Sequence, residues 1–391
     1  MIAVEEAKEL VCSNVFPLEI IEVNVVDALD FYLAADVVAP ISVPSFNQSA
    51  MDGYAFSFEC IKEQIPIVDE VAAGDSRNIK INKNEAVRIF TGSNVPNSCD
   101  TVVMQELTEI IGGKLVVKDS GLKQGGNIRF EGTQIKAGSV ALEKGAQINA
   151  ATVGFLATLG ITKVKVYQSP KVTIIATGNE LVQPGNQLRV GEIYESNTLM
   201  LNAALNKMNI NATIVLVKDN IKATQTAISE ALEKNQLLIL SGGISVGDYD
   251  FVKEALAYNG VEEVFYKVKQ KPGKPLYFGK TKKSYVFALP GNPAAALTCF
   301  YQYVRVAIAI MKGSKKLDLP KISLPIAKEL IKKEGRAVFY KATTDLKKVT
   351  ILEGQGSDIL KSFALANCFV YVKPEVTFIN QNDLVEVQLI P

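Results

Sequence analysis

The sequence predicts a multidomain chain of the α/β plus β class, built around a mainly parallel α/β sandwich. In the middle third, strand-like apolar runs alternate with helical runs, which is typical of a mainly parallel sheet covered by helices. Before and after the middle third, the sequence pattern changes to short strands separated by glycine turns, which predicts β-rich domains. For 391 residues, a prior of about 150 residues per domain suggests roughly two to four domains.

The expected elements follow in order along the chain. Residues 3–15 and 150–160 have helical spacing, and Gly160 is placed to end the second helix. Between them, Gly112-Gly113 joins two β-rich runs at 109–117 and predicts a hairpin. Strands are expected at 171–177, 212–218, 236–240, 262–269 and 284–289, and helices near 197–208, 222–234, 249–258 and 293–311. From about 316 onward the helices disappear, and a small β-barrel or sandwich is expected.

The composition excludes several classes of function. The chain has no histidine, which excludes histidine-based acid/base catalysis, Ser-His-Asp triads and histidine metal sites. Its five cysteines never form a CxxC pair, so free thiols in a reducing cytosol are expected rather than a zinc site or disulfides. The net charge of +1, the acidic N-terminus and the short apolar runs predict a soluble, cytoplasmic protein that binds neither nucleic acid nor membranes.

Polar and glycine-rich segments follow the predicted strands of the middle third. They are TGNE (177–180), KDN (218–220), SGGISVGDYD (241–250), KQKPGKP (269–275) and LPGNP (289–293). Ligands of such sheets bind beyond the carboxyl ends of the strands. The five segments therefore predict one ligand site at this edge of the sheet.

The segment SGGISVGDYD is the richest of the five. Gly242 and Gly243 permit positive φ and close approach of a ligand to the backbone, and a helix is expected just after them. A bound anion such as phosphate suits this arrangement, although the segment is not the GxxxxGK[ST] of a P-loop. Asp248 and Asp250 are candidates for binding Mg²⁺ beside a phosphate, or one of them caps the helix.

Charged and polar residues at the other strand ends complete the candidate site. Lys271 and Lys274 stand on a stiff KPGKP turn and suit a tetrahedral oxyanion, although lysines usually lie at the surface. Asp219 and Glu180 are candidates for binding Mg²⁺ or substrate, and capping or turn formation explains them equally well. Asn292 suits the cap of the helix after LPGNP, which is a structural role that still leaves an anion-binding helix end.

Two earlier segments, VPSFNQSAMDGYAF (43–56) and RIFTGSNVP (88–96), have no strong periodicity. Each is, from its residues alone, a structured turn, around Asp52-Gly53 in the first and Thr91-Gly92 in the second. Neither segment predicts a function by itself.

Taken together, PSFNQSAMDGYAF, RIFTGSNVP…DTVVMQE, SGGISVGDYDF, KPGKP and LPGNP resemble the molybdopterin molybdenumtransferase family, which includes the C-terminal domain of gephyrin. The resemblance runs nearly end to end, and GQGSDILKSFALANCF (354–369) is similar to the family's C-terminal barrel motif. It implies a homodimer whose active site lies between the α/β domain of one subunit and the inserted domain of the other. The domains implied are an elongated linker and dimerisation domain (1–40 with 138–167), an inserted β-rich domain (41–137), an α/β domain of the molybdopterin-binding type (168–315) and a C-terminal β-barrel (316–391).

The implied reaction takes molybdate and adenylylated molybdopterin, cleaves the phosphoanhydride with Mg²⁺ and releases AMP with molybdenum cofactor. A molybdopterin adenylyltransferase is the expected pathway partner. The resemblance assigns catalytic roles to Asp52, Thr91, Glu180, Asp219, Asp250, Lys271 and Lys274, with Asp219 and Asp250 as metal ligands. It assigns binding roles to Gly242, Gly243, Ser245, Pro290, Asn292, Arg336 and Ser362, the last two as an oxyanion-binding arginine and serine.

Three residues depart from the family's pattern. Gln134 and Asn179 stand where acids are usual, and Ala295 stands where the family has a hydroxyl. Neutral residues in place of acids are expected to weaken a cation site or to alter the pKa of neighbouring groups. An active enzyme is still favoured, because the other acids and both lysines remain. The alternatives are a tungstate-preferring enzyme, a catalytically altered paralogue that acts as a molybdopterin-binding or scaffold dimer, and a molybdopterin adenylyltransferase, which would leave the extra domains unexplained.

Overall fold

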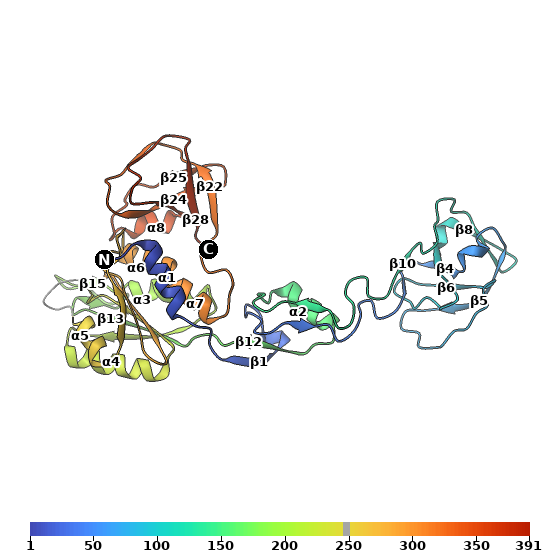
Figure 1. The fold of residues 1–391 in the computed structure, drawn as a ribbon, viewed down its shortest axis with the longest axis horizontal. Helices are drawn as coiled ribbons and strands as arrows, with labels where there is room; N and C mark the ends of the chain where they lie inside the picture. The colour runs from blue at the N-terminus through green and yellow to red at the C-terminus, as the bar shows by residue number, and fades with distance from the viewer. Residues whose placement is uncertain (245–250) are drawn as a thin grey trace.

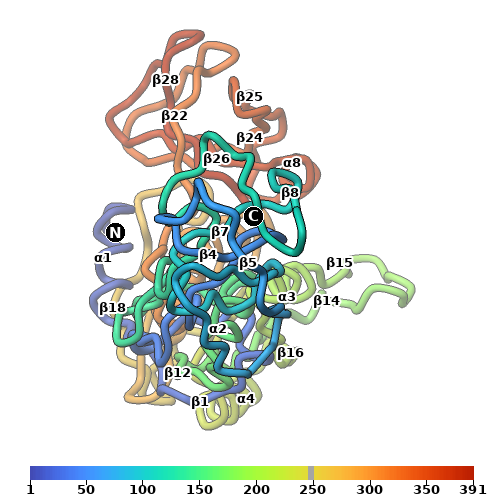
Figure 2. The backbone as a smooth tube through the Cα atoms, turned by 90° about the vertical axis from the view of Figure 1, so that its right-hand side faces the viewer, coloured from blue at the N-terminus to red at the C-terminus, as the bar shows by residue number. Residues whose placement is uncertain are grey.

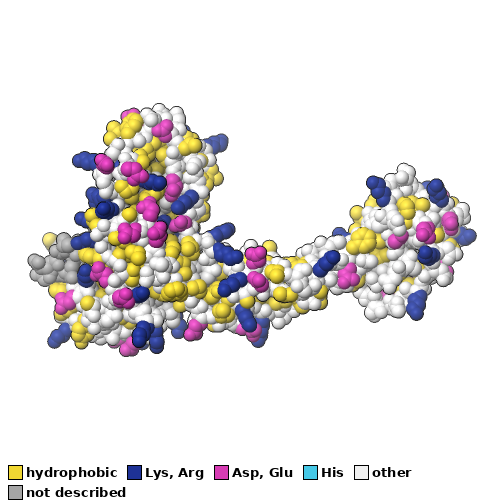
Figure 3. Space-filling model, in the orientation of Figure 1, with side chains coloured by type: hydrophobic (Ala, Val, Ile, Leu, Met, Phe, Trp, Pro, Cys, Tyr) yellow, Lys and Arg dark blue, Asp and Glu magenta, His cyan; other side chains and the backbone are white. Residues whose placement is uncertain are grey.

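The computed structural model describes residues 1–244 and 251–391. The chain is elongated, with the α/β domain and the C-terminal β domain at one end, a slender linker in the middle and the inserted domain at the other end (Figure 1). Acidic and basic side chains are interspersed over the face seen in Figure 3, in keeping with the net charge of +1.

The α/β domain contains a six-stranded sheet in the order β16-β13-β17-β21-β20-β18. Its strands are β13 (Val172–Thr177), β16 (Ala212–Val217), β17 (Leu237–Ser241), β18 (Glu262–Tyr266), β20 (Tyr277–Lys280) and β21 (Tyr285–Leu289). The first four strands in the sheet order are parallel, and β20 and β18 add an antiparallel edge. Strands β13 and β17 are buried at every position, which explains their continuous apolar sequence. The predicted mainly parallel sheet is confirmed.

Two hydrophobic cores lie on the two faces of this sheet. Ile174 of β13 enters the core with α3 (Asn197–Asn206), and its neighbour Ile175 enters the core with α4 (Ile221–Lys234) and α5 (Val252–Tyr258). The Asn220 side chain caps α4 by accepting from the Ala223 N–H at 3.1 Å. A short pair, β14 (Leu181–Val182) with β15 (Ile193–Tyr194), projects from the domain in Figure 2.

One continuous helical segment runs through the first core. It consists of α6 (Pro293–Cys299), the π-helical turn η4 (Phe300–Val304) and α7 (Arg305–Met311). Within the described residues it is the one helix long and apolar enough to cross a membrane, yet 83% of it is buried inside the molecule. That burial is expected of the core helix of a globular domain.

The first helix, α1 (Val4–Asn14), packs on this core and not on the linker. Val4, Ala7 and Val11 form its buried face, and the Lys8 ammonium lies 2.8 Å from a carboxylate oxygen of Asp318. By its packing, α1 therefore belongs with the α/β core. The physical reason is that an amphipathic helix needs an apolar surface to cover, and the α/β core supplies it.

The linker is built on an antiparallel ribbon of β1 (Ile20–Asn24) and β12 (Lys163–Tyr167). Beside the ribbon lie β2 (Val37–Val38) paired with β11 (Val140–Leu142), the 3₁₀ turn η1 (Val25–Asp27) and α2 (Ala150–Thr158). The Asn149 side chain caps α2 by accepting from the Thr152 N–H at 2.9 Å.

The inserted domain contains a sheet in the order β7-β4-β6-β5-β9-β8. Its elements are β3 (Gln48–Ser49), β4 (Gly53–Phe56), η2 (Phe58–Cys60), β5 (Ile65–Val71), β6 (Ala86–Ile89), β7 (Thr101–Met104), η3 (Gln105–Leu107), β8 (Thr108–Ile111), β9 (Lys114–Val117) and β10 (Ile128–Arg129). The predicted hairpin is confirmed as β8-β9, and Gly112 and Gly113 both have positive φ, which a two-residue turn of this kind requires.

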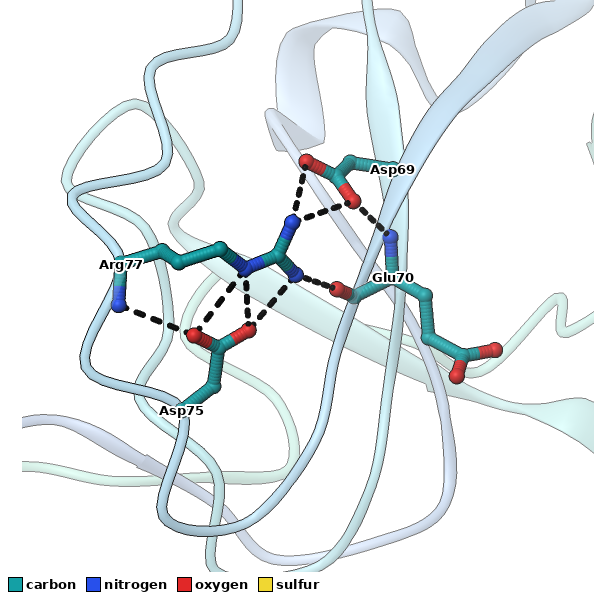
Figure 4. Close-up of polar contacts among 4 residues, drawn as sticks. All are labelled: Asp69, Glu70, Asp75 and Arg77. Atoms are coloured by element: carbon teal, nitrogen blue, oxygen red, sulfur yellow. Dashed lines mark hydrogen bonds and ion pairs between the residues drawn. The ribbon is translucent and has the colours of Figure 1, made fainter.

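Arg77 organises the exposed connection between β5 and β6 (Figure 4). Its guanidinium donates to Asp75 Oδ2 at 2.6 and 2.9 Å and to the Glu70 carbonyl at 2.7 Å, and it also reaches Asp69. Because the Arg77 side chain is 58% exposed, this cluster fixes the shape of the connection more than it stabilises the fold.

The C-terminal β domain contains a sheet in the order β19-β24-β26-β28-β22, with β25 also paired to β24. Its elements are β19 (Gln270–Lys271), β22 (Lys321–Pro325), β23 (Leu330–Ile331), β24 (Ala337–Thr344), β25 (Val349–Ile351), α8 (Leu360–Leu365), β26 (Cys368–Val372), β27 (Phe378–Ile379) and β28 (Leu384–Leu389). In the described part of the chain the ladder ends at β22 and does not return to β19, so the sheet is open where a barrel was predicted. Strand β19 comes from the α/β domain, so the two domains share one sheet.

Candidate functional site

A pocket of about 560 Å³ lies at the carboxyl ends of β13, β16, β17 and β21. Its lining residues come from the predicted strand-end segments and from the start of α3. They are Ala176, Thr177, Gly178, Glu180, Leu181, Ile193, Tyr194, Glu195, Ser196, Asn197, Asp219, Ser241, Gly242, Gly243, Ile244, Pro275, Pro290, Gly291, Asn292 and Pro293. The structure thus gathers five distant segments at the sheet edge where the sequence predicted a ligand site.

The two glycines after β17 are required by their neighbours. Both have positive φ, and a Cβ on Gly243 would lie 2.9 Å from Thr177 Oγ1, while one on Gly242 would lie 3.0 Å from the Thr177 carbonyl. Thr177 Oγ1 is buried and has no hydrogen-bond partner among the described residues. Ser245 and Asp250, both predicted site residues, lie outside the described residues.

Asn179 and Asp219 tie the ends of β13 and β16 together. The Asn179 N–H donates to Asp219 Oδ2 at 3.0 Å, and the Asp219 N–H donates to Asn179 Oδ1 at 3.2 Å. Asp219 lines the pocket, whereas Asn179 does not. The Asn179 backbone N–H therefore fixes the Asp219 carboxylate, and the Asn179 side chain holds the Asp219 backbone without lining the pocket.

Three carboxylates line the pocket, from Glu180, Asp219 and Glu195, and no lysine or arginine lines it within the described chain. The described residues contain no cluster of three acidic or thiol side chains close enough to hold one metal ion. One or two carboxylates completed by substrate phosphates and water are the usual protein environment of Mg²⁺. The donor set therefore fits a magnesium ion that arrives with a phosphate-bearing substrate.

The sequence analysis missed Glu195 and Asn197, which precede and begin α3. Glu195 is 4% exposed, and its carboxylate accepts from the Thr198 N–H at 2.8 Å and from the Thr198 hydroxyl. Asn197 Nδ2 donates to Ser241 Oγ and to the Gly291 carbonyl, both at 2.8 Å, so it joins β17 to the LPGNP segment. The run Glu195-Ser196-Asn197, directly before a helical pattern, could have pointed to these residues. The same run also predicts an ordinary helix cap.

The 269–275 loop carries the two predicted lysines on a rigid base. Gln270 is fully buried, donates to the Pro272 carbonyl at 3.0 Å and accepts from the Tyr303 hydroxyl. A Cβ on Gly273 would lie 2.4 Å from Cys299 Sγ, so only glycine fits there. Lys271 and Lys274 are exposed, and neither lines the pocket, although Pro275 of the same loop does.

Arg336 lies beside this loop. Strand β19 pairs with the start of β24, which places Lys271 opposite Val338 and Gln270 opposite Ala337. Arg336 directly precedes Ala337 and is exposed. Lys271 and Arg336, two of the cations that were predicted to bind an oxyanion, therefore belong to adjacent segments, with Arg336 two positions before the residue opposite Lys271.

Ser362 does not offer its hydroxyl to the pocket. It is 5% exposed, and its Oγ donates to the Gly354 carbonyl at 2.6 Å. The hydroxyl at the pocket rim belongs to Ser357, whose Oγ accepts from Asn292 Nδ2 at 2.8 Å and whose carbonyl accepts from the Ala295 N–H at 3.1 Å. The two serines are five positions apart in one motif, and only the packing of the 354–359 loop on α6 distinguishes them.

Asp52 and Thr91 form a second constellation in the inserted domain. Asp52 Oδ1 accepts from the Thr91 N–H at 2.7 Å and from its hydroxyl at 2.8 Å. The backbone hydrogen bond from Thr91, followed by the side-chain one, lowers the pKa of Asp52 below its ordinary value. The inserted domain, which carries this pair, and the α/β domain, whose strand ends line the pocket, lie at opposite ends of the molecule in Figure 1.

The remaining departures from the family pattern lie away from the pocket lining. Gln134 is exposed at the boundary between the inserted domain and the linker, where its N–H donates to the Val43 carbonyl at 2.9 Å. Ala295 is buried in α6 at 1% exposure. Neither side chain lines the described pocket.

Comparison with known proteins bears on all three parts of the chain. Residues 2–160 match the family described as MoeA N-terminal region (domain I and II), residues 173–309 match the probable molybdopterin binding domain, and residues 323–390 match the MoeA C-terminal region (domain IV). The molybdopterin molybdenumtransferase of Haemophilus influenzae is 33% identical over 99% of this chain and 98% of its own. The chain belongs to the molybdopterin molybdenumtransferase family.

Other relatives agree with this membership. The molybdopterin molybdenumtransferase of Staphylococcus aureus is 31% identical over 94% of this chain and 91% of its own. A crystal structure of a molybdopterin biosynthesis MoeA protein from Pyrococcus horikoshii superposes with a TM-score of 0.86 at 28% identity, over 100% of this chain and 99% of the other. The resemblance in the sequence is thereby confirmed, and the chain is an enzyme of a family that acts in molybdenum cofactor biosynthesis.

Proposed function

We propose that this protein inserts molybdate into adenylylated molybdopterin, with Mg²⁺-dependent cleavage of the phosphoanhydride and release of AMP. The main observation behind the proposal is that acidic side chains line the pocket while basic side chains lie on the neighbouring sheet. The pocket lining holds carboxylates and no cation within the described chain, whereas Lys271 and Arg336 belong to adjacent segments at the neighbouring shared sheet. The first environment suits a metal-bound anhydride, and the second suits a tetrahedral oxyanion.

Each group has a defined task in this reaction. Glu180 and Asp219 would hold Mg²⁺, which supplies charge neutralisation for the phosphates when bound. The Gly242–Gly243 backbone orients a phosphate close to the sheet edge, because no side chain stands in the way. Lys271, Lys274 and Arg336 attract the oxyanion, and the Ser357 hydroxyl, held by Asn292, donates to it in place of Ser362.

The reaction forms two Mo–S bonds from the two dithiolene thiols to molybdate, and one molybdate oxygen leaves as water with the two thiol protons. The anhydride is then cleaved by water. The P–O bond between the adenylate phosphorus and the bridging oxygen breaks, the pterin phosphate keeps that oxygen, and water adds to the adenylate phosphorus to give AMP. Positioning and charge neutralisation supply most of the acceleration in such phosphoryl transfers, which is consistent with a chain that lacks histidine.

The active unit in this proposal is a homodimer in which Asp52 and Thr91 of one subunit complete the pocket of the other. Two observations support it. The inserted domain that carries the pair lies at the opposite end of the chain from the α/β domain (Figure 1). The linker also exposes large apolar side chains, including Val26 at 79% and Ile20 at 54%, which a partner subunit would cover. A molybdopterin adenylyltransferase would supply the substrate.

The test is to incubate the purified protein with adenylylated molybdopterin and Mg²⁺, with or without molybdate, and to follow AMP. We expect AMP release that depends on both molybdate and Mg²⁺. Tungstate in place of molybdate examines metal preference in the same assay, and Lys283→Ala, an exposed change remote from the pocket, serves as the matched control. Substrate binding without molybdate-dependent or tungstate-dependent AMP would show a binding or scaffold protein instead.

A further inference from the structure

Lys341 lies in the middle of β24 with its ammonium group inside the C-terminal β domain. The residue is 1% exposed, and its Nζ donates to the carbonyl oxygens of Gly354 at 2.9 Å, Gly356 at 3.1 Å and Ile359 at 2.9 Å. It forms no ion pair with a carboxylate in the described structure. All three donors of a buried ammonium are therefore used by one loop, residues 354–359.

The backbone of Lys341 holds the same loop from another side. Its N–H donates to Gln355 Oε1 at 3.0 Å, and its carbonyl accepts from Gln355 Nε2 at 2.8 Å. Gly354 has a φ of +74°, so the loop begins in a conformation that side chains disfavour. The loop has no regular secondary structure, and its shape follows from the contacts made by Lys341 and by Ser362.

The outer side of this loop touches the candidate site. Ser357 bonds to Ala295 and Asn292 at the start of α6, and Asn292 lines the pocket. Asn292 donates to Ser357 Oγ, so the hydroxyl proton of Ser357 is directed elsewhere, and no acceptor for it lies among the described residues. The loop thus transmits the position of Lys341 to a free hydrogen-bond donor at the pocket rim.

A second buried lysine repeats the arrangement beneath Arg336. Lys332 is 7% exposed, and its Nζ donates to the carbonyls of Lys333 and Arg336, both at 3.2 Å, and of Pro374 at 2.9 Å. Burial lowers the pKa of both ammonium groups. Each of the two segments that the C-terminal β domain presents to the site is therefore held from inside by one ammonium group.

We propose that Lys341 and Lys332 are positioning residues for the oxyanion: Lys341 fixes the loop that presents Ser357, and Lys332 fixes the turn that presents Arg336. Neither ammonium touches the substrate. A compact ammonium with three donors suits three converging carbonyls, which a planar guanidinium does not match. The proposal rests on the oxyanion insertion proposed above, and it adds the residues that set the geometry of that step.

Lys341→Met tests the proposal, because methionine keeps the length and loses all three donors. We expect the KM for molybdate to rise about tenfold, the loss of one well-placed hydrogen bond, while kcat at saturating molybdate stays within about twofold. Ser357→Ala should give the same KM without loss of thermal stability. The double variant of Lys341→Met and Ser357→Ala should show no further rise in the KM for molybdate, since both changes remove the same interaction with the oxyanion. Lys332→Met should raise the KM in the same way through Arg336.

The matched control is Lys312→Met. Lys312 is also buried, at 5% exposure, and its ammonium donates to the Met208 carbonyl at 3.1 Å, away from the C-terminal β domain. This variant should lose stability with an unchanged KM for molybdate. If Lys341→Met behaves in the same way, Lys341 is only structural and the proposal is overturned. If Lys341→Met does not fold, Lys341→Gln keeps two donors and is measured in its place, with a smaller KM rise expected and an unchanged KM again overturning the proposal.

A binding measurement separates this proposal from the proposed reaction. Molybdate alone is titrated against the melting temperature of each full-length variant, and we expect it to raise the melting temperature of the native protein more than that of Lys341→Met. An equal rise in both proteins would overturn the role of Lys341 whether or not AMP is released. Absence of AMP release by the native protein would overturn the reaction alone.

Discussion

The α/β pocket and the Asp52–Thr91 turn use the same chemical group in two opposite settings. The pocket carboxylates are held by strand ends and enclosed by five segments of chain. Asp52 is exposed on the inserted domain and is organised by a single neighbour, Thr91. The α/β region is an enclosed pocket, whereas the inserted domain offers only an exposed carboxylate that is already oriented by Thr91. In the proposed homodimer each region supplies one half of a site, and the two halves come from different subunits.

The largest expected effect comes from neutralising either half. Asp219→Asn and Asp52→Asn each replace a carboxylate with an isosteric amide, and each should lower kcat for AMP release by about 100-fold or more, as loss of a positioned charged group does. Circular dichroism should show that both variants stay folded. Full activity in Asp52→Asn would remove the inserted domain from the site.

Mixing the two inactive variants tests whether the halves lie on different subunits. After subunit exchange, half of the dimers carry one of each variant, and each of these has one intact site, so about a quarter of the native activity should return. A mixture of Asp219→Asn with Glu180→Gln should recover nothing, because both changes lie on the same half. If the first mixture also stays inactive, the site is contained in one chain.

The smallest expected effect is on the pH dependence of stability. The pKa of Asp52 is lowered in the folded protein, so its ionised form is favoured by folding, and this contribution is present above the unfolded pKa of about 3.9. It disappears as the pH falls through the lowered folded value. The melting temperature of the native protein should therefore exceed that of Asp52→Asn by a constant amount from pH 5 to 7, by less as the pH drops below about 4. A difference that grows with acidity would contradict the Thr91 hydrogen bonds.

Strand periodicity was enough to predict the sheet and the edge at which its ligand segments meet. Residues 174–176 and 237–240 are apolar throughout, and a parallel sheet with both faces covered is the simplest fold for such runs. Glu180, Asp219, Gly242, Gly243, Pro290 and Asn292 all line the pocket because they follow such strands. The family was recognisable from motifs at these strand ends together with motifs in the inserted domain (44–56 and 88–106) and the C-terminal β domain (354–369).

The parts that sequence did not predict depend on packing between distant segments. Ser357 and Ser362 belong to one motif, and the direction of each hydroxyl is decided by contacts with α6 and with Gly354. Asn179 has the same length as an aspartate, and only its pairing with Asp219 shows that it does not line the pocket. The position of α1 followed from an apolar surface that lies some 300 residues further along the chain, at α7. Local patterns contain no information about such partners.

The slender linker has a mechanical consequence. The inserted domain is carried at the end of an arm whose base is the two-stranded β1–β12 ribbon (Figure 1). A ribbon of two strands resists twisting far less than a wide sheet does, because few contacts brace it. A small bend at the base becomes a large displacement of the inserted domain, as with any lever. In the proposed dimer, substitutions that change the stiffness of the ribbon are therefore expected to change turnover without touching a single reacting group.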